Sequence, residues 1–155
     1  MENFNLDARQ LARIEAVHRG FLYQHLYAAA CLFRAASSGA THVVVENDED
    51  VELVLPGHRI YAQIKTRGSR LIFSDVDGAL ARFDQIRDQH AAGRRGGTCQ
   101  FVVVANTPPG LELAERAAKA IWPNDVRLVY PGSGTGAPAL PEPWPTVDGA
   151  FDACR

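Results

Sequence analysis

The stretch DVELVLPGHRIYAQIKT, residues 50–66, decides the fold because it reads as two strands joined by a tight turn. Every second residue from 51 to 55 is apolar, which is the period of a strand with one buried face. Pro56-Gly57 is a turn signal, and residues 58–66 form the second strand. These features predict a β-hairpin in the first half of the chain.

Further strands are predicted on both sides of this hairpin. The valine-rich residues 41–46 precede it, so the three strands form an antiparallel meander. Residues 99–105 are a continuous apolar run, which suits a central strand. Residues 126–130 form a further short strand.

Helical spacing of apolar residues predicts helices over 7–36, 74–93 and 111–122. We expect residues 21–36 to be buried on most sides, because nearly all of them are apolar or small. Gly20 predicts a break, a kink or a close backbone approach in the first helix. The order helix, three strands, helix, strand, helix, strand predicts an α/β fold with helices on both faces of a mixed sheet.

The chain has 155 residues and a formal net charge of -2, which indicates one domain without the strong basic charge of a tight polyanion binder. The three cysteines lack CxxC spacing and the N-terminus is polar, so we expect the protein to be located in a reducing cytoplasm. No apolar run is long enough to cross a membrane. Residues 1–130 are predicted to form the domain. The Pro/Gly-rich residues 131–155 are predicted to be a linker or tail leading to an absent C-terminal domain.

Polar side chains gather at the ends of the predicted strands. Gln63 and Lys65 alternate with Ile64, so they share one strand face and lie roughly 7 Å apart. Glu46 closes the first strand, and Asp50 opens the second at one hairpin's distance from the glutamine. Carboxylate and amide oxygens beside a lysine suit a hard divalent cation and a phosphate.

This grouping predicts metal-dependent hydrolysis of phosphodiester bonds. Asp50 is the first candidate ligand for Mg²⁺, with Mn²⁺ as a substitute, and Glu46 and Gln63 are the others. The metal would neutralise phosphate oxygens and lower the pKa of a bound water. Lys65 would position or deprotonate that water and pair with the phosphate, since the pKa of a lysine shifts readily on partial burial.

Each assignment has a structural alternative. Acidic residues between strands are usually solvated turns, which is what we expect for Asp48 and Glu49, and a strand lysine is usually an exposed surface residue. Gln24 on the first helix either lines the site or bonds to a backbone carbonyl if it is buried. Arg67 and Arg70 either contact DNA phosphates or are ordinary loop residues.

Other chemistries lack their motifs. The five histidines show no HExxH or other zinc-ligand spacing. No serine or cysteine lies in a nucleophile-elbow pattern. The glycine-rich residues 131–136 lack the GK[ST] ending of a phosphate-binding loop, so a linker is the better interpretation.

Three motifs together resemble a known family: GFLYQ at residues 20–24, Glu46 with Asp50 four residues later, and QIKT at residues 63–66. In this order they resemble the PD-(D/E)xK restriction-endonuclease-like nucleases, in the QxK branch that includes Mrr-type enzymes. They are most similar to the N-terminal double-stranded DNA endonuclease domain of CD-NTase-associated antiphage effectors that carry a SAVED sensor domain. Related modules occur in other defence proteins, including STAND-type ATPases.

The resemblance covers residues 17–130 and implies a restriction-endonuclease-like core with a mixed central sheet flanked by helices. It implies a Mg²⁺-dependent endonuclease acting on double-stranded DNA with little sequence specificity, working through self-association or a larger defence assembly. The site residues that it implies are Asp50, Gln63 and Lys65 as the catalytic core, Glu46 as a helper and Gln24 as a lining residue. Two alternatives remain, a catalytically silent interaction or oligomerisation module of the same fold, and a nuclease for RNA or single strands.

Overall fold

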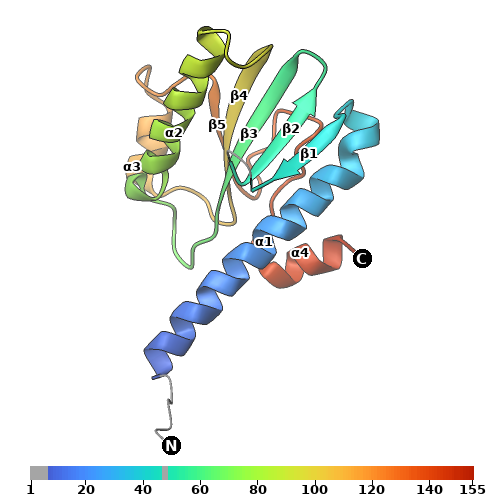
Figure 1. Cartoon of the computed structure of the whole chain (residues 1–155). Helices are drawn as coiled ribbons and strands as arrows, with labels where there is room; N and C mark the ends of the chain where they lie inside the picture. Colours follow the sequence, from blue (N-terminus) through green and yellow to red (C-terminus); the bar gives the residue numbers. More distant parts are fainter. Residues whose placement is uncertain (1–6, 47–48) are drawn as a thin grey trace, which may run out of the picture.

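The computed structural model describes residues 7–46 and 49–155. Five strands form one mixed sheet in the order β1-β2-β3-β4-β5 (Figure 1). The first three pair antiparallel, and β3 pairs parallel with β4, which pairs parallel with β5. The predicted meander and the α/β class with a mixed sheet are therefore confirmed. The strand bounds are β1 His42–Val45, β2 Val51–Leu55, β3 His58–Lys65, β4 Thr98–Ala105 and β5 Val126–Val129.

Four helices in the described part of the chain cover the two faces of the sheet. They are α1 Ala8–Ser38, α2 Phe73–Ala91, α3 Leu111–Ala117 and α4 Val147–Ala153. One core cluster joins α1 and α4 to the sheet, and a second joins α2 and α3 to its other face. Consecutive β4 residues alternate between the two clusters, with Val102 in the first and Val103 in the second, because a strand with helices on both sides buries every side chain.

The same alternation sets the direction of the β3 side chains. Ile60, Ala62 and Ile64 pack on the α1 side, whereas Tyr61 packs on the α2 side. Gln63 and Lys65 follow Tyr61 in the two-residue period, so their side chains leave the sheet on its α2 side at the carboxyl end of the strand. Gln63 and Lys65 therefore lie on the same face of β3, as the alternation in the sequence predicts.

Helix α1 runs through Gly20 without a break. Asp7 caps its first turn, with Asp7 Oδ1 accepting from the Gln10 backbone N–H at 2.8 Å, and Gly39 ends it at a φ of 79°. A Cβ at Gly20 would lie 3.3 Å from the Thr66 hydroxyl oxygen. Of the three expectations for Gly20, the close approach to another part of the chain is the one found, and it brings the loop after β3 against the helix.

The expected burial of residues 21–36 on most sides is wrong. Tyr23, Tyr27 and Cys31, spaced by one helical turn, form the buried stripe of α1, whereas Phe21 is 52% and Phe33 70% exposed. The reason is geometric, because the sheet, α4 and residues 137–147 pack against one side of the helix and its other side is exposed. The helix predicted over 111–122 is also shorter than expected, since α3 ends at Ala117.

The segment predicted to be an unpacked linker or tail is part of the domain. Leu140 is 1% exposed and lies in the core cluster of α1. The Tyr27 hydroxyl donates to the Pro141 carbonyl at 2.8 Å, and the Tyr23 hydroxyl donates to the Trp144 carbonyl at 2.7 Å. Composition predicted a linker because proline and glycine are rare in regular elements. Here they instead shape an irregular segment that covers the α1 side of the sheet. That a C-terminal domain follows stays a prediction.

No helix in the described residues is long and apolar enough to cross a bilayer. The three cysteines are free thiols, and Cys31 is buried among apolar side chains as expected of a small core residue.

Candidate functional site

A hollow of about 610 Å³ lies where β3 ends, between α1 and the loop after the strand. Gly20 contributes to its wall, which is where the helix and the loop come closest. The sequence placed five candidate residues in three different segments, and the fold brings them to this one hollow. They are Gln24, Asp50, Gln63, Lys65 and Arg67.

Asp50 spans the gap between β2 and β3. It immediately precedes β2, and its Oδ2 accepts a hydrogen bond of 2.7 Å from the Ile64 backbone N–H. The backbone pairing of β2 with β3 ends at Val51 and Ala62. The Asp50 side chain bonds to β3 just beyond that last pair. This contact holds the carboxylate at the carboxyl end of β3, where the hairpin spacing predicted it.

Burial is the largest influence on the pKa of Asp50, and it raises that pKa above its ordinary value. The Ile64 N–H and the charge of Lys65 act in the opposite direction, and the charge of Glu46 adds to the rise. Lys65 and Glu46 are therefore both within electrostatic reach of the Asp50 carboxylate. A carboxylate that is partly desolvated and faces a second negative charge favours a cation.

The amide of Gln63 has a defined orientation. Its Nε2 donates a hydrogen bond to Oε2 of Glu49. An ionised carboxylate only accepts hydrogen bonds, so the NH₂ group faces Glu49 and the amide oxygen Oε1 is turned away from it. Oε1 accepts no hydrogen bond from any described residue, and it is the atom that a hard cation would use.

Glu49 corrects an expectation, because it is 3% exposed and not a solvated turn residue. Besides Gln63 it contacts Arg82 of α2, with 3.3 Å between Glu49 Oε1 and Arg82 Nε. The pKa of Glu49 is raised above its ordinary value, mainly by burial, and the contacts with Gln63 and Arg82 act in the opposite direction. The other residue of the predicted solvated turn, Asp48, lies outside the described residues.

Sequence reasoning missed Glu49 and Arg82 as parts of the site. The hairpin register offered a signal for the first of them. Val51 pairs with Ala62 and Leu55 with His58, so continuing the pairing past Val51 sets Asp50 opposite Gln63 and Glu49 opposite Ile64, the next residue. No local pattern pointed to Arg82, because it reaches the site from a helix that packs there only in the folded chain.

Glu46 is near the hollow but does not line it. Its Oε1 lies 3.2 Å from Nε2 of His25 on α1, and both side chains are more than half exposed. Its backbone has a φ of 54°, a conformation that costs a residue with a side chain about 1 kcal/mol or more. Its predicted role as a metal ligand stays a prediction, supported only by its electrostatic effect on Asp50.

The other predicted site residues, Gln24, Arg67 and Arg70, have different environments in the structure. Gln24 lines the hollow and makes no hydrogen bond to another described residue, so the alternative of a bond to a backbone carbonyl is not found. Arg67 also lines the hollow, with its Nε donating to Asp75 Oδ1 at 2.7 Å. Arg70 lies outside the lining and reaches the Pro109 carbonyl at 3.5 Å.

The donor set fits a weakly held Mg²⁺ and not a closed metal cage. Within residues 7–46 and 49–155, no three His, Cys, Asp or Glu side chains gather at one point. Mg²⁺ usually keeps several waters and takes only one or two carboxylates. The Asp50 carboxylate and the Gln63 amide oxygen are both hard oxygen donors at the same hollow, so they match that requirement.

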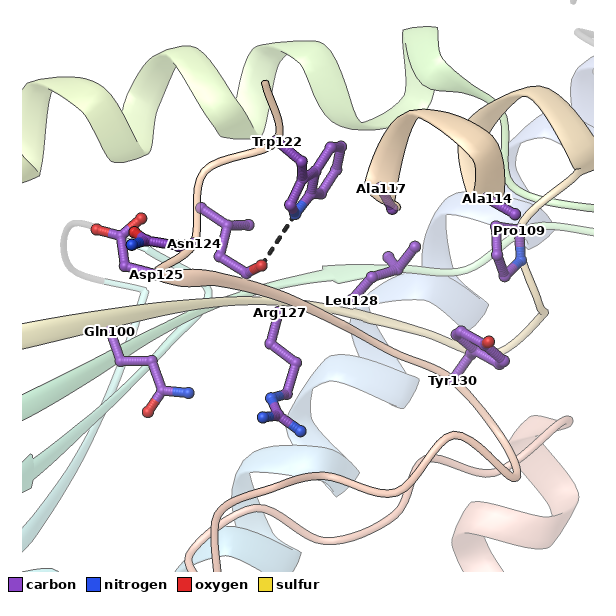
Figure 2. A pocket seen from close by; sticks show the side chains of 11 residues that line it. Gln100, Pro109, Ala114, Ala117, Trp122, Asn124, Asp125, Arg127, Leu128 and Tyr130 are labelled. Carbon is purple, nitrogen blue, oxygen red and sulfur yellow. Dashed lines mark hydrogen bonds between the residues drawn. The ribbon is translucent and has the colours of Figure 1, made fainter. Parts of the chain in front are cut away.

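A second hollow, of about 410 Å³, lies beside β5 and α3 and contains none of the predicted site residues (Figure 2). The Trp122 indole N–H in it is bonded to the Val126 carbonyl at 2.9 Å. Asp125 is held by two hydrogen bonds from Arg87, of 2.6 and 2.7 Å. The Arg127 side chain lies on the side of β5 opposite to Trp122 (Figure 2). The Trp122 indole and the Asp125 carboxylate are both bonded within the fold, so we assign this hollow no chemistry.

Comparisons of this chain with protein-family models, with curated proteins and with solved structures find no match. The function proposed below therefore depends on the sequence motifs and on the geometry of the hollow at the end of β3. That geometry offers one fixed carboxylate, one oriented amide and one lysine to a bound molecule.

Asp50→Asn is expected to stabilise the fold in the absence of metal while removing the carboxylate that is the first candidate metal ligand. The pKa of Asp50 is raised on folding, so the folded state keeps its proton at a pH where the unfolded state has lost it. The parent therefore loses stability as pH rises from about 3.8 through the raised pKa, and asparagine does not titrate. Thermal unfolding should show the variant's advantage growing as the pH rises from about 3.8 through the raised pKa and staying constant above it.

The matched control for this prediction is Asp77→Asn, which changes an exposed aspartate of α2. Adding MgCl₂ should raise the melting temperature of the parent and of the control, and leave that of Asp50→Asn unchanged. A variant that is less stable than the parent at every pH would mean that the Asp50 carboxylate is there to hold the hairpin together.

Proposed function

We propose that this chain is a Mg²⁺-dependent endonuclease domain that cuts double-stranded DNA, with a restriction-endonuclease-like fold. The element order supports the fold, since a helix, an antiparallel three-stranded meander, a helix and a strand parallel to β3 follow one another. This is the order that the resemblance implies, with an acidic residue opening the second strand and Gln-x-Lys on the third.

One observation carries the proposal. Asp50, Gln63 and Lys65 line the same hollow at the carboxyl end of β3, although Asp50 precedes β2 and the other two residues lie on β3. Had the Asp50 side chain been buried deep in the core, the three groups could not meet a common ligand. Because they meet at an open hollow, a phosphate in solution can reach them.

Each residue of the site has a separate role in the proposed hydrolysis. A bound Mg²⁺ supplies charge neutralisation at the phosphate and a more acidic water. The Asp50 carboxylate and the Gln63 amide oxygen hold the cation at the end of β3. Lys65 pairs with a phosphate oxygen and orients the attacking water or takes its proton. Glu49 positions Gln63 by accepting its NH₂ group, and Arg82 holds Glu49 in place.

The low charge of the chain favours weak binding of DNA by a single copy, and the low sequence specificity is what the resemblance implies. The formal net charge of -2 gives little non-specific attraction for DNA, so one copy should grip its substrate weakly. We therefore propose that the domain acts in a defence assembly, where several copies or further domains hold the same DNA. Arg67, beside Lys65 at the hollow, would contact phosphates and not bases.

A second candidate function is a catalytically silent interaction module with the same fold. It is favoured by the apolar residues that α1 leaves exposed, among them Leu11, Ile14 and Val17, each at least 43% accessible. Exposed apolar side chains in a row favour a protein partner. Such a module would self-associate and would bind neither Mg²⁺ nor Mn²⁺.

Incubation of the purified chain with supercoiled plasmid tests the proposal. We expect nicked and linear DNA to appear with MgCl₂ or MnCl₂, to be absent with EDTA, and to increase more than linearly with protein concentration. Duplex DNA should be cut in preference to single-stranded DNA and RNA. No cleavage at any concentration, together with no heat of Mn²⁺ binding by calorimetry, would favour the silent module.

A further inference from the structure

The first half of α1 is an arm that extends away from the sheet. Helix α1 begins at Ala8, but its first buried side chain is Tyr23, four turns later. Every residue from 7 to 19 is exposed. Figure 1 shows this half of α1 running out from the body of the domain beyond α4. The capping box at its tip shows that the sequence specifies a helix there, although no described element packs against it.

One face of the arm continues the wall of the hollow. The α1 residues in that wall are Ala16, Val17, Gly20, Phe21 and Gln24. A helix turns about 100° per residue, so side chains 7 and 11 residues before Gly20 point within about 20° of its direction. Those side chains are Arg13 and Arg9.

The distances along the arm suit a bound polymer. At about 1.5 Å of rise per residue, Arg13 lies roughly 10 Å and Arg9 roughly 16 Å beyond Gly20 along the helix axis. Duplex DNA presents one negative charge per roughly 1.7 Å of its axis. A duplex whose scissile phosphate occupies the hollow and whose axis runs along α1 would place further phosphates alongside this face.

The two arginines are available for such contacts. The arm between Ala8 and Gly20 holds three arginines and one glutamate, and that glutamate, Glu15, is paired with Arg19 at 2.7 Å. No hydrogen bond or ion pair connects Arg9 or Arg13 to another described residue. Positive charge without an internal partner, on the face that leads into the hollow, is complementary to a nucleic-acid backbone.

We propose that Ala8–Arg19 is a DNA-tracking arm, in which Arg9 and Arg13 bind phosphates of the duplex next to the cleavage point. The inference rests on the proposed nuclease function and adds a contact surface to it. The arm binds any sequence, because it touches the backbone and not the bases. It also provides a local DNA-binding surface beside the hollow in a domain whose overall charge is low.

Two apolar residues of the arm, Leu11 and Ile14, lie away from this face, whereas Val17 is part of the wall of the hollow. Leu11 and Ile14 point about 180° and 120° away from the direction of Gly20. They are 52% and 43% exposed, respectively. A second copy of the chain could cover that side while DNA lies on the other. The experiment therefore has to separate the two surfaces.

The test compares an Arg9→Ala, Arg13→Ala double variant with the parent on a fluorescein-labelled 30-base-pair duplex. EDTA is present so that the DNA stays intact, and anisotropy is recorded over about 50 to 300 mM NaCl. We expect roughly tenfold weaker binding at the low-salt end, and a plot of log K against log[salt] that is less steep by about 1.8, or 0.9 for each phosphate contact. An Arg9→Lys, Arg13→Lys variant, which keeps the charge, should retain most of the parent's affinity.

The controls distinguish the possible failures. Leu11→Gln, Ile14→Gln changes only the apolar side and, at the parent's oligomeric state, should bind DNA as the parent does. Equal affinity and slope for the parent and the double alanine variant, when the parent does bind and cut DNA, would overturn the arm and leave the nuclease proposal intact. A parent that neither binds nor cuts DNA would overturn both.

Sedimentation velocity completes the test. The double alanine variant should have the same oligomeric state as the parent. If it binds DNA less well only because an oligomer has dissociated, the arm is an interface between copies, and the inference is overturned.

Discussion

Lys65→Ala is expected to lower the rate of plasmid cleavage by about 10³-fold or more. The side chain lies at the hollow and is close enough to Asp50 for its charge to lower the pKa of that carboxylate. Removing a group that pairs with the phosphate and handles the proton of the water typically costs 10² to 10⁴ in rate. Cleavage is measured as loss of supercoiled plasmid in MgCl₂ over a range of protein concentrations.

The chain offers a matched control, because its only other lysine, Lys119, is exposed and lies outside the hollow. Lys119→Ala removes the same charge and should cut DNA like the parent. Lys65→Ala should keep the parent's melting temperature, because the side chain is at the rim and not in a core cluster. If both lysine variants cut equally well, Lys65 has no part in the chemistry and the roles assigned here are wrong.

The second large effect is expected from Glu49→Gln. This change keeps the shape of the side chain but removes the charge that pairs with Arg82 and the carboxylate that accepts from Gln63. The replacement amide can present either its oxygen or its NH₂ group to Gln63, so the Gln63 amide is no longer held in one orientation. We expect Mn²⁺ affinity and cleavage rate each to fall by about 10- to 100-fold, as for other groups that orient a metal ligand.

Glu52→Gln is the matched control for that prediction. Glu52 is also buried, at 1% exposure, but it pairs with Arg59 and does not contact Gln63. The two substitutions make the same chemical change in glutamates three residues apart in the sequence. Calorimetry of Mn²⁺ binding tests positioning directly, because a purely structural role for Glu49 would lower stability without a separate loss of metal affinity. Equal Mn²⁺ affinities for the two variants would contradict the role given to Glu49.

Local pattern predicted much of the framework. The alternation in residues 51–55, the Pro56-Gly57 turn and the apolar run that became β4 each carry their own period or turn chemistry. The same hairpin spacing predicted that Asp50 would come close to Gln63. Local signals were enough here because a two-residue turn sets the register of both strands at once.

Patterns failed where a residue's environment came from a distant segment. Glu49 reads as a surface acid, but it is buried in the folded chain, where Gln63 and Arg82, 33 positions later, contact its carboxylate. The segment 131–145 reads as a linker, but hydrogen bonds from Tyr23 and Tyr27 hold parts of it against α1. A proline- and glycine-rich composition shows that a segment lacks regular structure and does not show whether it is packed.

The sequence by itself determined the order of helices and strands as far as β5, the hairpin register and the shared face of Gln63 and Lys65, since periodicity and turn type are local properties of the chain. It did not predict α4, which lies in the segment expected to be a linker or tail. The tertiary structure decided which groups meet at the end of β3, which acid is buried there, and which side of α1 is left uncovered. The physical reason is that burial and charge pairing depend on contacts between segments far apart in the chain, and these exist only once the helices have packed on the two faces of the sheet.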